Sequence, residues 1–157
     1  MTSTLYVDNL VEKTSGNGVH IPGHVIQVVN SGVATDAFSF SGDNSNLFSA
    51  TITPKFASSK ILVLGSITSE RITSNVNSYY YGNLGRSINS GANTFLTRIA
   101  NAIGYQAPQY MRESHSNEYY DIPNTTYPIE YIFSVDINGS GTFAVKACSL
   151  TLLEIAQ

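Results

Sequence analysis

Apolar and polar residues alternate along the stretch from residue 129 to residue 137. On an extended chain, most of the apolar side chains fall on one face and most of the polar ones on the other, with Ile132 as the exception. The apolar face consists of Ile129, Tyr131, Phe133, Val135 and Ile137. Because successive side chains of a strand point to opposite faces, this period of two predicts a half-buried β-strand.

Residues 60–68, Lys-Ile-Leu-Val-Leu-Gly-Ser-Ile-Thr, are apolar on both faces of the expected strand. A strand of this kind is covered by the opposing sheet on one side and by a neighbouring subunit or loop on the other. We therefore expect the chain to have a second apolar surface that needs a cover.

Short stretches with strand character recur from residue 25 onward, and residues typical of turns separate them. The predicted strands cover residues 25–29, 33–41, 47–53, 60–68, 75–83, 129–137 and 142–156, the last with a bulge. Seven or more short strands at this spacing predict an all-β fold, a jelly-roll-like β-sandwich.

The pattern changes between residues 91 and 128. Leu96, Ile99 and Ile103 would share one face of a helix and Asn93 could cap it, so a helix of a few turns is predicted here between two glycines. The polar and aromatic run 105–127 is predicted to form strands joined by long loops, and long loops on a β scaffold are where binding residues are usually placed.

Residues 1–24 differ from the rest, because their short apolar stretches surround a run of turn residues. The apolar residues are Leu5, Val7, Leu10, Val11, Val19 and Ile21. A segment this short cannot bury its own apolar side chains. We predict that it is a stalk or attachment segment, wound with its own copies or docked on a partner, ahead of a sandwich head at residues 25–157.

Composition and charge limit the classes of partner that this chain is expected to bind. Charged residues make up 12% of the chain, against about 25% in a typical domain, so Ser, Thr, Asn and Gly must supply the surface polarity. The net charge of −3 and the scattered Lys and Arg argue against nucleic acid. No apolar run approaches about 20 residues, and the N-terminus lacks a secretory signal pattern, so neither membrane insertion nor secretion by a signal peptide is expected.

Reactive groups are sparse, and we expect no catalytic residue, no cofactor and no enzyme activity. The three histidines lie away from any nucleophile motif, and the acidic residues of the run 105–127 are interpreted as a solvated surface. Cys148 lies in a strand pattern and is predicted to be a small buried residue. His20 and His24 would form rings of imidazoles on a threefold axis and are weak candidates for a metal, but interface or solvated histidines are the simpler interpretation.

Tyrosine is the dominant aromatic residue, with ten copies and no Trp. Tyr79, Tyr80 and Tyr81 must alternate faces in a strand, so a ring remains on the outer side. The triplet is predicted to serve the core or a subunit interface, with ligand contact as the alternative. A second group of polar and aromatic residues is predicted to form a binding tip: Tyr105, Tyr110, Arg112, Asn117, Tyr119, Tyr120 and Asp121.

Several short segments together resemble a family of bacteriophage tail-fibre proteins that is common in phages of marine bacteria and cyanobacteria. They are Thr-Leu-Tyr-Val-Asp-Asn-Leu at residues 4–10, Glu-Lys-Thr-Ser-Gly-Asn-Gly-Val at 12–19, Ala-Thr-Ile-Thr-Pro at 50–54 with Ser-Ser-Lys-Ile-Leu-Val at 58–63, Tyr-Asp-Ile-Pro-Asn-Thr-Thr at 120–126 with Tyr131, and Ser-Leu-Thr-Leu-Leu-Glu-Ile at 149–155. Residues 90–117 depart from the family's pattern, as a partner-specific tip would.

The resemblance implies a homotrimeric virion protein whose N-terminal part joins other tail or baseplate proteins and whose head faces the host. The predicted function is therefore that of a tail fibre of the virion, which binds a host-surface receptor, a glycan, lipopolysaccharide or protein, through the tip residues. Two alternatives remain open: a decoration or baseplate protein without a ligand, and a lectin-like carbohydrate-binding module.

Overall fold

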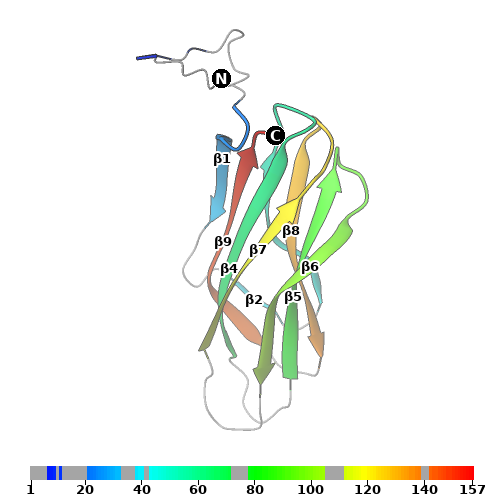
Figure 1. Cartoon of the computed structure of the whole chain (residues 1–157). Helices are drawn as coiled ribbons and strands as arrows, with labels where there is room; N and C mark the ends of the chain where they lie inside the picture. The colour runs from blue at the N-terminus through cyan, green and yellow to red at the C-terminus, as the bar shows by residue number, and fades with distance from the viewer. Residues whose placement is uncertain are drawn as a thin grey trace.

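The computed structural model of the chain describes residues 7–9, 11, 21–32, 38–40, 43–71, 78–104, 112–138 and 142–157. These residues form nine β-strands and no helix. The strands build two antiparallel sheets that pack face to face, as Figure 1 shows.

The first sheet has the strand order β1-β9-β4-β7, and β2 also pairs with β9. Its strands are β1 (Val25–Gly32), β2 (Phe38–Phe40), β4 (Lys60–Arg71), β7 (Arg112–Asp121) and β9 (Phe143–Ile155). The second sheet has the order β3-β8-β5-β6. Its strands are β3 (Asn44–Ile52), β5 (Ser78–Ile88), β6 (Thr94–Gly104) and β8 (Ile129–Asn138).

The order of the strands is that of a jelly roll. β1 pairs with residues 149–155 of β9 and β2 with residues 143–145, so the two behave as halves of one interrupted strand. If β1 and β2 are counted as one strand and the strands are renumbered from 1 to 8 in chain order, the first sheet has the order 1-8-3-6 and the second the order 2-7-4-5. This is the strand order of a jelly roll. The predicted all-β, jelly-roll-like sandwich is confirmed.

The sandwich has two distinct ends. At one end the C-terminus lies beside the start of β1 (Figure 1), where the Gly23 N–H donates to the Ala156 carbonyl over 2.8 Å and the Ala156 N–H donates to the His24 carbonyl over 2.9 Å. We call this the proximal end. At the opposite, distal end Glu70 of β4 pairs with Arg112 of β7.

The inward faces of both sheets supply the core. Tyr131 and Phe133 of the predicted alternating strand β8 are fully buried, and the Phe133 ring stacks on Phe48 with centroids 4.8 Å apart. From the first sheet, residues such as Ile61 and Leu152 bury their side chains against them. The alternation read from the sequence therefore fixes which face of β8 meets the opposing sheet.

The helix predicted around Leu96 and Ile99 is wrong, because this segment is strand β6. The register with β5 shifts twice, so that Leu96 and Ile99 are each an extra residue without a direct partner across the ladder. Such β-bulges interrupt the alternation of faces. Both side chains turn toward the core three residues apart, and that spacing resembles the period of a helix.

Other strands differ from the prediction at their ends. β5 runs from Ser78 to Ile88 rather than over residues 75–83, and β1 extends to Gly32. Part of the predicted strand 33–41 lies outside the described residues. The bulge predicted in the last strand is present, because Lys146 is an extra residue of β9 opposite the step from Thr68 to Ser69 of β4.

Buried polar side chains join the two sheets at the proximal end. Arg86 of β5 donates through Nη1 to both carboxylate oxygens of Asp121 of β7, at 2.5 and 2.7 Å. The Tyr131 hydroxyl of β8 donates to Asp121 Oδ2 over 2.7 Å. The Asp121 side chain is only 6% exposed, so this network replaces the water that the carboxylate loses on folding.

A second buried carboxylate holds the connection between β3 and β4. Glu154 of β9 is fully buried. It accepts hydrogen bonds from Gln27 Nε2 at 2.6 Å and from the backbone N–H groups of Lys55 at 2.8 Å and Phe56 at 3.3 Å. β1, β9 and the loop after β3 are therefore fixed to one side chain.

Two buried tyrosine hydroxyls are also hydrogen bonded. The hydroxyl groups of Tyr80 and Ser69 lie 2.7 Å apart in the core, and burial raises the pKa of Tyr80 to about 12. Burial and the hydrogen bond to Asp121 also raise the pKa of Tyr131. In the folded protein both hydroxyls therefore keep their protons at pH values at which an exposed tyrosine is already deprotonated.

We expect replacement of Asp121 by Ala to lower the free energy of unfolding by about 3 kcal/mol, because it leaves the Arg86 charge and the Tyr131 hydroxyl without their partner. Arg112→Ala is the matched control: the Arg112 side chain is 63% exposed, so its loss should cost less than about 1 kcal/mol. Urea unfolding of the two variants measures the difference. Equal losses would contradict a structural role for the Asp121 network.

High pH should destabilise the protein through Tyr80. In the unfolded chain the Tyr80 hydroxyl has its ordinary pKa of 10.0, whereas in the folded protein its pKa is about 12. Between these values the folded state binds more protons, so the free energy of unfolding should fall by about 1.4 kcal/mol per pH unit from this group. Urea unfolding at several pH values should show a shallower fall in Tyr80→Phe than in the wild type; parallel slopes would refute the assignment.

Candidate functional site

A row of apolar side chains crosses the outer face of the first sheet. Val28 of β1 pairs with Leu153 of β9, Leu153 with Leu62 of β4, and Leu62 with Tyr120 of β7. Each of these residues has a neighbour in the chain that is buried or packed on the core, so each points away from the second sheet. We call these four residues the apolar row.

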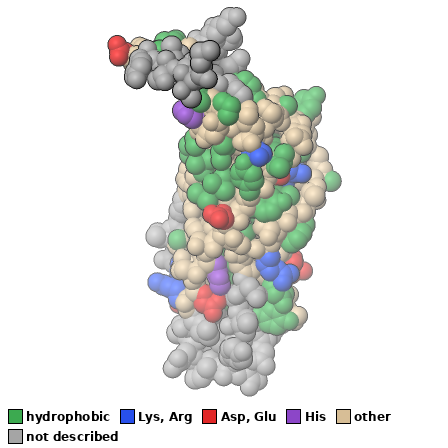
Figure 2. All heavy atoms as spheres, in the orientation of Figure 1, with side chains coloured by type: hydrophobic (Ala, Val, Ile, Leu, Met, Phe, Trp, Pro, Cys, Tyr) green, Lys and Arg blue, Asp and Glu red, His purple; other side chains and the backbone are tan. Residues whose placement is uncertain are grey.

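Further apolar residues border the apolar row. Val25 and Ile155 pair on its proximal side, and Leu64 follows on its distal side. Val28 is 59% exposed, Tyr120 47% and Leu64 38%. Figure 2 shows hydrophobic side chains gathered over the proximal half of this face.

The strand geometry gives the approximate size of this patch. Strands about 4.8 Å apart and rows about 7 Å apart give a patch on the order of 300 Å². The Lys60 ammonium lies 5.2 Å from the centre of the Tyr120 ring at its border. A patch of this size is within the range of the largest apolar patch on a typical soluble monomer, and such patches often mark interaction sites.

A polar hollow adjoins the apolar row on its distal side, where small residues take the place of large ones. Ser149, Ser66 and Ser116 stand in register across β9, β4 and β7. The hollow has a volume of about 470 Å³. It is lined by Leu64, Gly65, Ser66, Ser116, Asn117, Glu118, Ser149 and Thr151.

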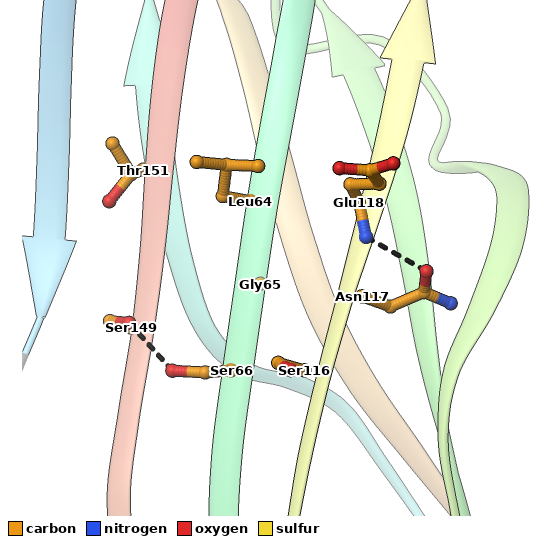
Figure 3. Close-up of a pocket in the computed structure, with 8 residues that line it drawn as sticks. All are labelled: Leu64, Gly65, Ser66, Ser116, Asn117, Glu118, Ser149 and Thr151. Carbon is orange, nitrogen blue, oxygen red and sulfur yellow. Dashed lines mark hydrogen bonds between the residues drawn. The ribbon is translucent and has the colours of Figure 1, made fainter.

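The lining of this hollow is mainly polar. The hydroxyl groups of Ser66 and Ser149 lie 2.8 Å apart, and Asn117 Oδ1 accepts from the Glu118 N–H over 2.8 Å (Figure 3). The lining residues carry no imidazole or amine, and their one ionisable side chain is the Glu118 carboxylate. The hollow offers hydroxyl groups and one exposed carboxylate to a neighbour.

Charged residues lie beyond the hollow, near the distal end. Arg112 donates to Glu70 Oε2 over 2.9 Å, and the Lys146 ammonium lies 3.6 Å from the same oxygen. The hydrogen bond from Arg112 is the main cause that lowers the pKa of Glu70. This face therefore changes from apolar at the proximal end to charged at the distal end.

The residues predicted to form a binding tip are not brought together by β7. Tyr105 and Tyr110 lie outside the described residues. The segment from Arg112 to Asp121 is one regular strand rather than a loop, so it spans the length of the sandwich. Arg112 points outward at the distal end, whereas Tyr120 belongs to the apolar row at the proximal end.

The other three predicted tip residues lie on the inner side of β7. Tyr119 packs against the core, and Asp121 holds the buried network described above. Asn117 lies at the edge, where its Nδ2 donates to the Arg98 carbonyl of β6 over 3.2 Å. The acidic residue interpreted as solvated, Asp121, is thus buried because a cation of the opposing sheet faces it.

Much of the predicted attachment segment 1–24 lies outside the described residues. These undescribed residues include three of the six predicted attachment residues, Leu5, Leu10 and Val19, and the candidate metal ligand His20. Val7 and Val11 are exposed, Ile21 is half-buried, and His24 is exposed. In the part of the chain that the structure describes, no three His, Cys, Asp or Glu side chains gather as metal ligands would. The same residues contain no helix of the length and apolarity that a membrane crossing requires.

Cys148 packs against the core with intermediate exposure. Burial raises the pKa of its thiol, which disfavours the reactive thiolate. The residue therefore behaves as the small packing residue that the strand pattern predicted, although it is half-buried rather than fully buried.

The three consecutive tyrosines alternate faces as predicted. Tyr80 is fully buried, while Tyr79 and Tyr81 lie on the outer face of the second sheet with ring centroids 5.2 Å apart. The Arg98 guanidinium of β6 lies over the Tyr81 ring, 3.8 Å from its centroid. The helix predicted around Leu96 and Ile99 hides this contact, which depends on the pairing of β5 with β6.

No protein-family model matches the chain, and no curated protein matches it in sequence. Among solved structures, a chain of infectious bursal disease virus strain Gx matches over 98% of this chain and 42% of its own, with 13% identity and a TM-score of 0.47. A chain of strain Gt matches over 83% and 38%, with 14% identity and a TM-score of 0.42. This chain thus spans less than half of either viral chain, and at these values the likeness assigns neither family nor function.

Proposed function

We propose that the chain is a structural protein of a virion, a phage tail fibre that associates as a homotrimer and binds a receptor on the host surface. The apolar row on the outer face of the first sheet is the single observation that supports this proposal most. A lone copy would leave this row in water, whereas copies arranged around an axis would cover it.

The arrangement of the two ends supports the same proposal. The segment 1–24 precedes β1, which starts at the proximal end, beside the C-terminus (Figure 1). Attachment to tail or baseplate proteins through this segment would direct the distal end of the sandwich away from the particle. The apolar row lies near the proximal end, where sister copies would meet just beyond the attachment segment.

The resemblance to tail-fibre proteins supports the assignment to a virion. Its segments are 4–10, 12–19, 50–54, 58–63, 120–126 with Tyr131, and 149–155. Three copies would present three receptor sites together, so that a weak individual site gains strength from multivalency. The predicted tip residue Arg112 lies at the distal start of β7 and remains a candidate for receptor contact. Tyr105 and Tyr110, which lie outside the described residues, also remain candidates. A decoration protein without a ligand would share the trimer but would not bind host cells.

We expect the wild-type protein to have the mass of three 17.0-kDa chains in light scattering. Replacement of Leu62 by Lys should yield monomers, because it places a charge at the centre of the covered face. Thr51→Lys, on the exposed outer face of the second sheet, is the matched control and should stay trimeric. A monomeric wild type, or a trimer that survives Leu62→Lys, would contradict association through this face.

The virion assignment predicts that particles purified from the phage of origin contain this protein. Antibodies raised against the full chain should label the tail in electron micrographs and block adsorption of the particles to host cells. Absence of the protein from the particle would refute the assignment. Labelling of the tail without any block of adsorption would favour a structural protein that binds no receptor.

A further inference from the structure

A cluster of aromatic and hydrogen-bonding side chains lies on the outer face of the second sheet, toward the distal end. The strand register brings its members together: Tyr81 of β5 pairs with Asp136 of β8, and Asn83 of β5 pairs with Arg98 of β6. Tyr79 pairs with Asn138, two residues closer to the distal end. We call these six residues the distal cluster.

Stacking and hydrogen bonds hold the cluster in a defined geometry. The Arg98 guanidinium is stacked on Tyr81, and the Tyr79 ring meets Tyr81 edge to face. Asn138 Nδ2 donates to the Tyr79 hydroxyl over 2.7 Å. Planar side chains that are fixed before binding lose little conformational entropy when a ligand arrives.

The cluster keeps hydrogen-bonding capacity that the described residues do not use. The exposed Arg98 guanidinium makes no ion pair within the described part of the chain. Asp136 is exposed and accepts from Asn83 Nδ2 over 2.8 Å through Oδ2, which leaves Oδ1 for another donor. Asn83 is 6% exposed, and its Oδ1 has no partner among the described groups.

We propose that the distal cluster is a saccharide-binding site, in which Tyr79 and Arg98 contact the sugar ring while Arg98 and Asp136 bind its hydroxyl groups. This inference rests on the proposed function and names the chemistry of the receptor. It places receptor contact on the second sheet, which stays open when the first sheet faces sister copies.

The mixture of groups selects a saccharide over other ligands. Sugar hydroxyls both donate and accept, so they match a guanidinium and a carboxylate on the same face of the sheet. The Asp136 carboxylate would repel a strongly anionic ligand, and the polar groups around the rings would be left unpaired by an apolar peptide. The Tyr81 hydroxyl beside Tyr79 raises the pKa of Tyr79, so the Tyr79 hydroxyl stays protonated and neutral.

The test measures binding of the labelled full-length protein to cells of the bacterium that the phage infects. The wild-type protein should bind to untreated cells. Treatment of the cells with periodate, which cleaves the carbon–carbon bond of vicinal diols in sugars, should abolish this binding. Protease treatment of the cells should leave binding intact. Arg98→Ala should weaken binding at least tenfold, and Arg98→Lys should also weaken it because Lys keeps the charge but cannot stack as a plane.

Lys55→Ala removes one exposed cation near the proximal end and is the matched control, with binding expected to remain as in the wild type. Thermal unfolding and light scattering should show that all variants stay folded and keep the wild-type mass. Binding that survives periodate but not protease, or that persists in Arg98→Ala, would overturn the saccharide site and leave the proposed function standing. A folded wild type that binds no host cells would remove both receptor binding and this inference.

Discussion

The antiparallel pairing of β4 with β9 is the constraint on which the rest of the molecule depends. These strands occupy the centre of the first sheet, and β1, β2 and β7 each pair with one of them. The register that buries Val63 beside Leu152 also places Leu62 beside Leu153 on the outside. Because a slip of one residue would exchange the two faces, the buried core and the exposed apolar row are set by the same ladder.

Two buried carboxylates hold the strands together at the proximal end, which the segment 1–24 precedes. Asp121 joins β7 to β5 and β8 of the opposing sheet, and Glu154 joins β9 to β1 and to the loop after β3. Buried carboxylates are tolerated only when hydrogen bonds replace lost water. Both networks therefore specify how the strands meet at the end where the chain enters the head.

The two outer faces of the sandwich differ in chemistry, and this difference underlies both proposals. The first sheet presents Val28, Leu62 and Tyr120 in one row, and burial of this apolar surface would lower the free energy. The second sheet presents Tyr81, Arg98 and polar neighbours, a surface suited to hydrogen-bonded ligands in water. A trimer that hides the first face would leave the second face open to the host.

The alternation of apolar and polar residues was enough to predict an all-β sandwich, strand β8 and the second apolar surface around residues 60–68, because side-chain direction in a strand is a local property. Only the tertiary structure decided that Leu96 and Ile99 belong to a bulged strand, since an extra residue is recognised by the ladder it interrupts. The burial of Asp121 and the stacking of Arg98 on Tyr81 likewise depend on partners from other strands. A linear sequence shows which way a side chain points along its own strand, but the neighbours it meets are set by pairings between residues that are far apart in the chain.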